Sequence, residues 1–475
     1  MLRSRARSAI TLAGLLSVTS AFLSTTQSRT AEAAPRPNIV IIMTDDQRWD
    51  TIAPRFMPRL RDRMIAGTNA VYLRHAFVSN PTCCPSRVTT LTGRYSDSTG
   101  VFGNSGTFSG GLSTGGGGFE SFNDDPAVNP TIATDLHSAG YRTALVGKYL
   151  NHYPNGTNWT YVPPGWDRWF SVKSGSYYNY HAAADGRLRV FGNDPADYST
   201  RVLAHKAMSF IQNSRTQGGP FFLYFAPTAP HGPAIADPRD VGRFDRYVDG
   251  YQGPESVGEA NISDKPAYIR KRGWSHRLQR RYDEFHARQL SAIYGVDRAV
   301  AKIWKALPDN TVVLYMSDNG YEWGEHRWSG KLVPYNESIR VPMILATKGL
   351  GAPDIDRTRM ALNVDIRATL GSFAGRSPAT MGLAWTDPAW SRNGFVLEHW
   401  RFSVVPTYCG IRSAEWMYVR YSSGAEELYD ERTDPYELAN MASTDPPVLA
   451  SLRTEAAALC TQGTRYPPDW PFLPR

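Results

Sequence analysis

Cysteine is scarce in this chain, which has four in 475 residues. Two of them, Cys83 and Cys84, are adjacent, and neighbouring cysteines rarely bridge each other because a disulfide needs more separation than neighbours provide. Cys409 and Cys460 are the other two, and a distant pair of this kind suits a disulfide in an oxidising compartment. That pairing leaves the two adjacent thiols free, so their placement needs another explanation.

Long hydrophobic runs are absent beyond the first residues. Three arginines precede a largely apolar stretch at 10–23, and Ala31-Glu32-Ala33 follows as a small-x-small cleavage site. This is the layout of a secretory signal peptide, and the stretch is too short and too interrupted for a good membrane span. We expect residues 1–33 to be cleaved rather than kept as an anchor. The mature protein is then secreted, periplasmic or cell-wall associated, with no membrane contact.

Neither sign of charge is in large excess, and no repeat of solenoid period is visible. The formal charge of +8 falls to +5 when residues 1–33 are removed, because they hold four arginines and one glutamate. A modest positive balance favours anionic substrates or glycans, although it is equally ordinary for a basic exported protein. We expect no nucleic-acid partner.

Short apolar runs that end in polar or turn residues recur along the chain. They predict strands at residues 38–43, 143–146, 221–225, 311–316 and 341–346. Continuous apolar runs of this length are typical of strands buried on both faces of a parallel sheet. Helical stretches lie between them, the clearest at 282–307 with one apolar face. Alternating strands and helices predict an α/β fold with helices on both sides of the sheet.

The pattern changes after about Asp387, where short strands at 394–397 and 416–419 precede a helix near 447–460. We therefore predict a main domain at 34–386 and a smaller C-terminal α+β subdomain at 387–475.

The segment Gly100–Gly118 is rich in glycine and serine, with four consecutive glycines at its end. Such a composition favours a flexible surface loop, and a lid over a site is the alternative.

Polar side chains follow two of the predicted strands. Asp45 and Asp46 come directly after one strand, and Asp318 and Asn319 follow another. Because α/β sheets bind ligands at the carboxyl ends of their strands, these residues belong together. Four oxygen-bearing side chains suit a hard divalent cation such as Ca²⁺ or Mg²⁺, whereas an isolated acid pair is more often a solvated turn or a helix cap.

The adjacent cysteines precede a predicted helix. A residue at position 83 would lie beside unpaired backbone N–H groups that attract anions. Arg87, one turn later, could bind an oxyanion through two hydrogen bonds. Lys148, His231 and Lys331 also follow strand ends or flank these loops. Together with a metal ion, these residues describe a site for a tetrahedral oxyanion, sulfate or phosphate.

A resemblance to a known family explains the cysteines. Cys83-Cys84-Pro85-Ser86-Arg87 with Leu91-Thr92-Gly93-Arg94 resembles the C-x-P-S-R…L-T-G-R signature of type I sulfatases. The resemblance extends to Thr44-Asp45-Asp46-Gln47, to Ser317-Asp318-Asn319-Gly320 with Gly324-Glu325-His326 and Lys331, and to Glu427-Leu428-Tyr429-Asp430. It implies an alkaline-phosphatase-like sandwich with a large, mostly parallel central sheet flanked by helices.

The resemblance also implies a mechanism. In this family a formylglycine-generating enzyme oxidises the first cysteine, here Cys83, to an aldehyde whose hydrate is the nucleophile, and Cys84 fills the variable position. The implied ligands of Ca²⁺, or of Mg²⁺, are Asp45, Asp46, Cys83, Asp318 and Asn319. The implied catalytic residues are Cys83, Arg87, Lys148, His231 and Lys331.

The expected substrate is a sulfated carbohydrate or an aryl sulfate. Gly147-Lys148-Tyr149-Leu150-Asn151 and Pro163-Pro164-Gly165-Trp166 resemble the glucosamine-6-sulfatase branch, which acts on 6-O-sulfated N-acetylglucosamine or glucosamine. In many sulfatases a histidine stands at the position of Leu150, and the resemblance implies that it acts as the base when the sulfated intermediate breaks down. That role is unassigned in this chain, with His152 a candidate by its proximity in sequence. The alternatives are a phosphonate or phosphate ester hydrolase of the same superfamily, and a catalytically silent secreted glycan-binding protein.

Overall fold

The computed structural model describes residues 35–66, 69–110, 113–123, 130–154, 158–248, 251 and 253–473. The predicted signal peptide, residues 1–33, lies outside them. Residues 36–475 form one compact unit, and the boundary at 386/387 inside it stays a prediction. Among the described residues, no helix is long and apolar enough to cross a membrane.

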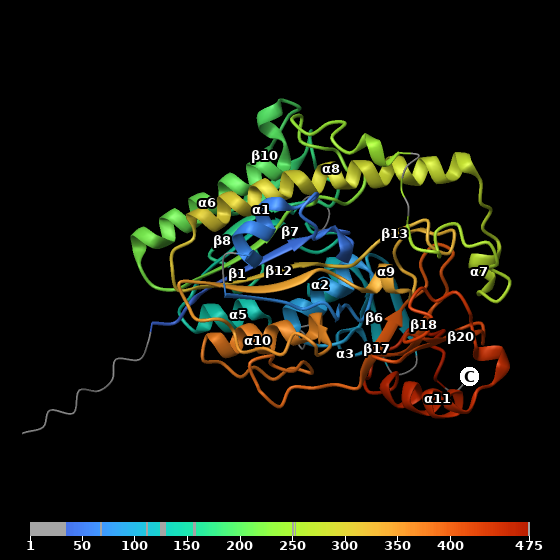
Figure 1. The fold of residues 1–475 in the computed structure, drawn as a ribbon. Coiled ribbons are helices and arrows are strands. Elements are labelled where there is room, and N and C mark those ends of the chain that lie inside the picture. The colour runs from blue at the N-terminus through green and yellow to red at the C-terminus, as the bar shows by residue number, and fades with distance from the viewer. Residues whose placement is uncertain are drawn as a thin grey trace, which may run out of the picture. The chain divides into compact units, whose positions relative to one another are not determined.

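In the described part of the chain, nine strands form the central sheet (Figure 1). In spatial order they are β10 (Arg187–Val190), β9 (His181–Ala184), β8 (Arg168–Val172), β7 (Arg142–Lys148), β11 (Phe221–Ala226), β1 (Asn38–Thr44), β12 (Thr311–Ser317), β15 (Met343–Lys348) and β2 (Asn69–Tyr72). Each of the five apolar runs predicted as a strand is a strand of this sheet, and the predicted α/β sandwich is confirmed.

The sheet is mixed rather than mostly parallel. The five central strands, from β8 to β12, run parallel, whereas β10, β9, β15 and β2 pair antiparallel. The connection from β12 to β15 contains no long helix to carry the chain back across the sheet. Strand β15 therefore starts at the edge where β12 ends, which makes the pair antiparallel. An apolar run buried on both faces gives no sign of its direction.

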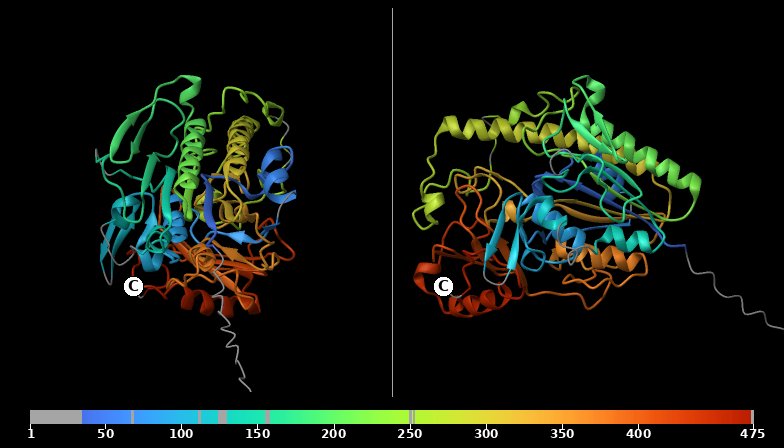
Figure 2. Two further views of the ribbon diagram at one scale, coloured as in Figure 1. Left: turned by 90° about the vertical axis from the view of Figure 1, so that its left-hand side faces the viewer. Right: turned by 180° about the vertical axis from the view of Figure 1, so that it is seen from behind.

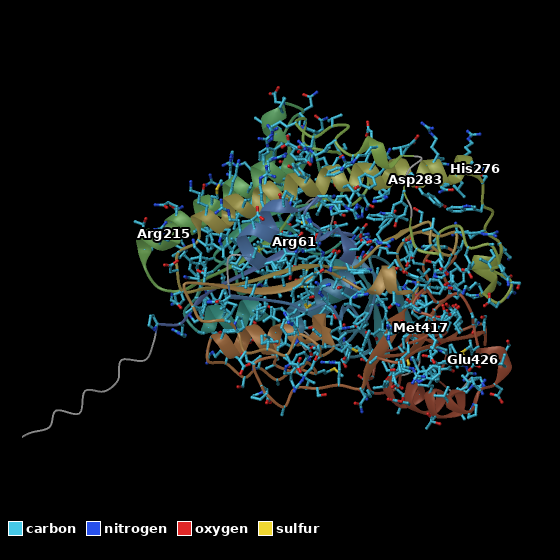
Figure 3. All side chains as sticks on the ribbon, in the orientation of Figure 1. Arg61, Arg215, His276, Asp283, Met417 and Glu426 are labelled. Atoms are coloured by element: carbon cyan, nitrogen blue, oxygen red, sulfur yellow. A yellow bond between two sulfur atoms is a disulfide. The ribbon has the colours of Figure 1, made fainter. Side chains whose placement is uncertain are left out.

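Helices cover both faces of the sheet. Helices α6 (Ser199–Gln217) and α8 (His276–Ala306) lie side by side over one face (Figure 2), and Figure 3 labels Arg215 near the end of α6 and His276 at the start of α8. The opposite face carries α2 (Cys83–Thr92), α5 (Ile132–Ser138) and α10 (Ile366–Phe373). Two buried apolar clusters, one on each face, hold the layers together. Helix α8 begins before the predicted range because Ser275 caps it by accepting from the backbone N–H of Leu278.

Shorter elements connect these layers. The helices are α1 (Pro58–Leu60), α3 (Ser96–Thr99), α4 (Gly118–Asn123), α7 (Ala267–Arg270) and α9 (Asn336–Ile339), and Arg61–Ala66 is a short π-helix. Single 3₁₀ turns lie at Trp49–Thr51, Pro195–Asp197, Asp245–Tyr247, Asn363–Asp365 and Ala442–Thr444. Two-stranded ladders join β3 (Ala76–Phe77) to β16 (Ala361–Leu362) and β13 (Glu322–Trp323) to β14 (Ser329–Gly330).

The flexible loop predicted at Gly100–Gly118 is wrong. The segment forms a small sheet of β4 (Val101–Gly103), β5 (Thr107–Gly110) and β6 (Ser113–Gly117). A Cβ added at Gly117 would lie 2.4 Å from the backbone of Gly103. Glycine therefore serves close backbone approach here, which composition alone does not distinguish from flexibility.

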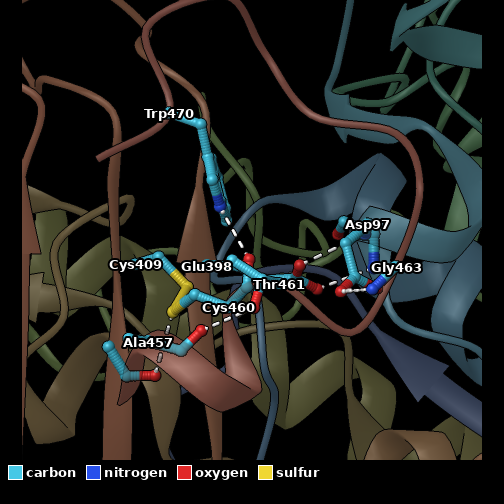
Figure 4. The surroundings of a disulfide bond; sticks show 10 residues. Asp97, Glu398, Cys409, Ala457, Cys460, Thr461, Gly463 and Trp470 are labelled. Carbon is cyan, nitrogen blue, oxygen red and sulfur yellow. Dashed lines mark hydrogen bonds between the residues drawn. A yellow bond between two sulfur atoms is a disulfide. The ribbon is translucent and has the colours of Figure 1, made fainter. Parts of the chain in front are cut away.

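The C-terminal region forms an antiparallel sheet, as predicted for a separate α+β element. Its strands are β17 (Gly394–His399), β18 (Tyr408–Ser413), β19 (Trp416–Tyr421) and β20 (Glu426–Asp430), followed by α11 (Pro447–Leu459). Cys409 on β18 forms a disulfide with Cys460 at the end of α11 (Figure 4). Glu398 on β17 accepts a hydrogen bond of 2.7 Å from the backbone N–H of Ser96, which ties this sheet to the segment that follows α2.

Candidate active site

The two polar strand ends meet at one edge of the sheet. Strands β1 and β12 pair in parallel up to Thr44 and Ser317, so the residues after them lie side by side. The backbone N–H of Asp46 donates to Asp318 at 3.1 Å, and the side-chain amide of Asn319 donates to Asp46 at 2.8 Å. The structure therefore brings together two segments, distant in the chain, whose proximity the sequence predicts.

Helix α2 presents Cys83 to this edge. Cys83 is its first residue and is fully buried, with Sγ 3.5 Å from Asp45 Oδ1 and 4.0 Å from Asp46 Oδ1. The side chain of Asn104 accepts from the backbone N–H of Cys84 at 2.9 Å and so fixes the start of the helix. No sequence motif points to Asn104, because it lies in the segment predicted as a flexible loop.

Three cations surround the thiol and the carboxylates. Arg87 donates to Asp318 at 2.8 Å, while its Nη2 is buried, 3.9 Å from Asp45, and has no hydrogen-bond partner among the described residues. Lys148 Nζ lies 2.9 Å from both carboxylate oxygens of Asp45. Lys331 donates to Asp46 and lies 2.7 Å from Cys83 Sγ. The three cations match the charge of the three aspartates, so an anion that enters the site meets hydrogen-bond donors in a nearly neutral cluster.

His231 and Ser174 lie on the open side of the cluster. His231 Nδ1 is 2.7 Å from the carbonyl oxygen of Gly232, which only accepts, so Nδ1 carries a proton and Nε2 faces Asp46 at 3.7 Å. The hydroxyl of Ser174 donates to Asp45 at 2.9 Å. Ser174 follows strand β8, which is not among the strands predicted from the sequence, so no predicted strand end points to Ser174.

The surroundings set the charge states of the central groups. Burial opposes ionisation of Asp45, but the positive charges of Lys148 and Arg87 outweigh it and hold the pKa of this carboxyl well below its usual range. Burial raises the pKa of the Cys83 thiol to about 12 against the opposing effect of the two lysines. The unmodified thiol is therefore protonated at neutral pH and is a poor nucleophile.

The donor set fits a divalent cation. Asp45, Asp46, Cys83 and His231 offer ligand atoms that lie within 4.8 Å of one another. The carbonyl oxygen Oδ1 of Asn319 is buried beside them, and no residue that the structure describes donates a hydrogen bond to it. A buried oxygen of this kind is costly unless a cation or water completes it. Carboxylate and amide oxygens are the ligands that Ca²⁺ and Mg²⁺ prefer.

A buried polar network holds the loop that carries Lys331. His326 Nδ1 lies 2.7 Å from Glu259, and Lys265 approaches Glu259 at 3.6 Å. Lys265 also donates to the hydroxyl of Tyr429 on β20 at 3.1 Å. The C-terminal sheet thus braces the catalytic edge through residues whose partners are far apart in sequence.

The residue in the position of the family histidine is apolar. Leu150 is buried in the core on the α2 side of the sheet. His152 is largely exposed and lies 3.6 Å from Glu120, and none of the contacts among the described residues joins it to Cys83. It lines a cavity of about 380 Å³ together with Lys173 and Ser174, so it faces the approach to the site.

Two family models match the chain. Residues 37–375 match the model described as Sulfatase, and residues 324–459 match the model described as N-sulphoglucosamine sulphohydrolase, C-terminal. The first match alone covers more than two thirds of the chain and contains every residue of the predicted site.

The chain is also similar to several named sulfatases. The chain is 29% identical to an arylsulfatase of Volvox carteri over 90% of this chain and 74% of the relative. It is 32% identical to an extracellular sulfatase homologue of Drosophila melanogaster over 77% of this chain and 32% of the relative. It is 30% identical to the human N-acetylglucosamine-6-sulfatase over 73% of this chain and 62% of the relative. The chain therefore spans only part of the length of the last two.

Solved structures share the fold. A protein crystallised with its substrate D-glucosamine-2-N,6-O-disulfate matches with a TM-score of 0.71 at 21% identity, over 89% of this chain and 96% of the other. A phosphonate monoester hydrolase of Agrobacterium radiobacter matches with a TM-score of 0.65 at 17% identity, over 89% and 95%. Taken with the family models and the relatives, these matches assign the chain to the type I sulfatases, which are sulfuric ester hydrolases, near their N-acetylglucosamine-6-sulfatase branch.

Proposed function

We propose that the chain hydrolyses sulfate esters with a formylglycine made from Cys83 by a formylglycine-generating enzyme. The observation that carries this proposal is the position of Cys83 Sγ, which lies at the start of α2 within hydrogen-bonding reach of Lys331 and beside Asp45. The sulfur stands where an oxygen of the hydrated aldehyde would lie. One hydroxyl of that hydrate attacks the sulfur atom of the substrate's sulfate ester. The second hydroxyl then loses its proton, which re-forms the aldehyde and expels sulfate.

A divalent cation, Ca²⁺ or Mg²⁺, completes the proposed site. Asp45, Asp46, Asp318 and Asn319 would hold it together with the oxygen of residue 83. The unpartnered Asn319 Oδ1 supports this assignment. When bound, the cation lowers the pKa of the attacking hydroxyl and neutralises charge on a sulfate oxygen.

The remaining residues act on the sulfate group and the leaving sugar. Arg87 has a free buried Nη2, and Lys148 and Lys331 direct their ammonium groups to the same centre. In our proposal these donors bind the equatorial oxygens and stabilise the charge that develops on them. In our proposal His231, when it carries a proton at Nε2 as well as at Nδ1, donates the Nε2 proton to the leaving oxygen from the open side of the cluster.

We assign the substrate to sulfated carbohydrates, with 6-O-sulfated N-acetylglucosamine-type sugars or aryl sulfates as the specific candidates. Cavities of about 380 and 340 Å³ flank the site and share Lys173 and Ser174. Trp159 and Tyr178 line the second one. Aromatic surface beside a lysine suits an anionic sugar. The substrate named for the solved relative supports the same class.

A phosphonate or phosphate ester hydrolase is the second candidate. The phosphonate monoester hydrolase of Agrobacterium radiobacter has the same fold, and sulfate and phosphate esters share a tetrahedral geometry.

The predicted signal peptide at 1–33 supports a secreted or periplasmic protein, and the extracellular sulfatase homologue supports the same location.

Turnover of an aryl sulfate and an aryl phosphonate at matched concentration tests the proposal. We expect the sulfate to be the better substrate, Cys83→Ala to abolish its turnover, and Cys84→Ala, the matched change at the neighbouring buried thiol, to retain it. Preference for the phosphonate would favour the second candidate. Full activity of Cys83→Ala would refute the nucleophile.

A further inference from the structure

A large cavity lies away from the catalytic edge of the sheet. Its volume is about 600 Å³, and it is bounded by the flank of α6 and by strands β7 to β10 at one end of the sheet. Figure 2 shows the β9–β10 hairpin beside α6. Arg142, which lines it, begins β7, whereas Lys148 ends the same strand. At about 3.3 Å per residue the two positions are about 20 Å apart, so the end of the cavity that Arg142 lines is distant from the catalytic centre. The lining continues along β7 to Val146, but it includes none of the residues proposed for catalysis or metal binding.

The cavity is strongly basic. Its charged lining consists of Arg142, Arg168, Arg187, Arg189, Lys206 and Asp185. Asp185 pairs with Arg168 at 3.4 Å. Within the described ranges, no ion pair involves the other four cations, so four positive charges are left without an anionic partner. Unpaired cations that converge on one concave surface favour an anionic ligand.

The cations are combined with aromatic side chains. The Arg142 guanidinium lies 5.6 Å from the centre of the Phe210 ring, and its Nη1 is buried with no hydrogen-bond partner in the described part of the chain. Lys206 Nζ lies 5.2 Å from the centre of the Phe170 ring. Such a lining offers both charged donors and apolar ring faces.

Strand β10 directs its arginines into this cavity. Arg187 and Arg189 alternate with Leu188 and Val190, and only the arginines line it. All four residues of β10 are exposed, so the two arginines line the cavity from its solvent-exposed side, whereas Leu188 and Val190, at 45% and 69% exposed, do not line it. The alternation of a strand therefore gives β10 one cationic face toward the cavity.

We propose that this cavity is a second binding site for a sulfated oligosaccharide. Guanidinium groups bind sulfate oxygens in pairs of hydrogen bonds, and the volume falls within the roughly 300–1,000 Å³ of small-molecule sites. A concave pocket with aromatic walls suits a sugar chain better than a flat bilayer. The anion site rests on the cavity alone, whereas the choice of a sulfated glycan rests on the proposed function.

A second site changes how the enzyme treats polymers. A long chain that occupies the cavity raises the local concentration of its own sulfate groups near the catalytic edge. An aryl sulfate is too small to use both sites. Cavity variants should therefore lose activity on polymers and keep activity on aryl sulfates.

The experiment measures binding of a heparin-derived hexasaccharide by calorimetry in the full mature chain with Cys83→Ala, which removes hydrolysis. We expect Arg187→Gln/Arg189→Gln to weaken binding by about tenfold or more, because two charge-assisted hydrogen bonds are lost. The matched control is Arg277→Gln/Arg281→Gln, two exposed arginines in the first turns of α8, with an expected change below about twofold. Lys206→Gln, on α6, tests the cavity without altering β10.

Equal hexasaccharide affinity of the cavity and control variants would overturn the proposal. The proposal would also be overturned if the cavity variants lost affinity only for phosphatidylserine vesicles, or only for duplex DNA, because either result would identify a different polyanion as the ligand. In the enzyme with Cys83, the cavity variants should lower kcat/KM for the sulfated polymer and leave that for an aryl sulfate unchanged. Absence of aryl sulfate turnover in every variant would instead count against the proposed function and not against this site.

Discussion

Replacement of Lys148 by methionine tests the electrostatics of the site. Lys148 is 1% exposed, and its Nζ lies 2.9 Å from both oxygens of Asp45 and 3.8 Å from Asp318. Methionine keeps most of the side-chain volume and removes the charge. Asp45 then keeps the hydrogen bond from the hydroxyl of Ser174, the contact with residue 83 at 3.5 Å and the Arg87 guanidinium at 3.9 Å.

The size of the effect follows from these contacts. Two opposite charges 2.9 Å apart interact by about 6 kcal/mol at an effective dielectric constant of 20. Removal of one member of a buried pair costs about 3–5 kcal/mol because the other charge is left behind. Loss of one donor to the developing charge lowers the rate by about 10²–10³-fold. We therefore expect Lys148→Met to lower kcat at least about 100-fold and to lower the thermal midpoint.

The assay is steady-state hydrolysis of an aryl sulfate, run well below the unfolding temperature of each variant. Lys302→Met removes the same charge from an exposed position on α8 and should leave kcat unchanged. A folded Lys148→Met enzyme with kcat within about threefold of the parent would refute the reasoning, since Lys148 would then only stabilise the fold.

Three further predictions concern the metal ion, a missed residue and the disulfide. Chelation should abolish activity and lower the thermal midpoint, and Ca²⁺ should restore both; full activity after exhaustive chelation would contradict the metal site. Ser174→Ala removes a hydrogen bond to a charged carboxylate and should lower activity about tenfold, and an unchanged Ca²⁺ affinity and rate would show that Ser174 does not orient Asp45. Cys409→Ala/Cys460→Ala opens a link across 51 residues and should cost about 4 kcal/mol of unfolding free energy in denaturant titration, whereas a loss below 1 kcal/mol would contradict that reasoning.

The sequence was sufficient wherever one segment determines the structure. The buried strands and the polar residues after them are local signals, and parallel pairing of β1 with β12 then brings Asp46 and Asp318 together. The helix that begins at Cys83 follows from the proline two residues later, which suits a first helical turn.

The remaining features depend on contacts between distant residues. Ser174, Asn104 and Glu259 carry no motif, and each functions through a partner at least 20 positions away. The direction of β15 depends on the connection that precedes it, and Gly117 of β6 serves close backbone packing. Composition and periodicity do not encode such pairings.

The most direct test of the account is mass spectrometry of the tryptic peptide that spans residues 75–87, from protein made in its native host. We predict that Cys83 has lost its sulfur and gained an aldehyde oxygen, that Cys84 is intact, and that sulfatase activity rises in proportion to the modified fraction. An unmodified Cys83 in fully active protein would contradict the proposed nucleophile.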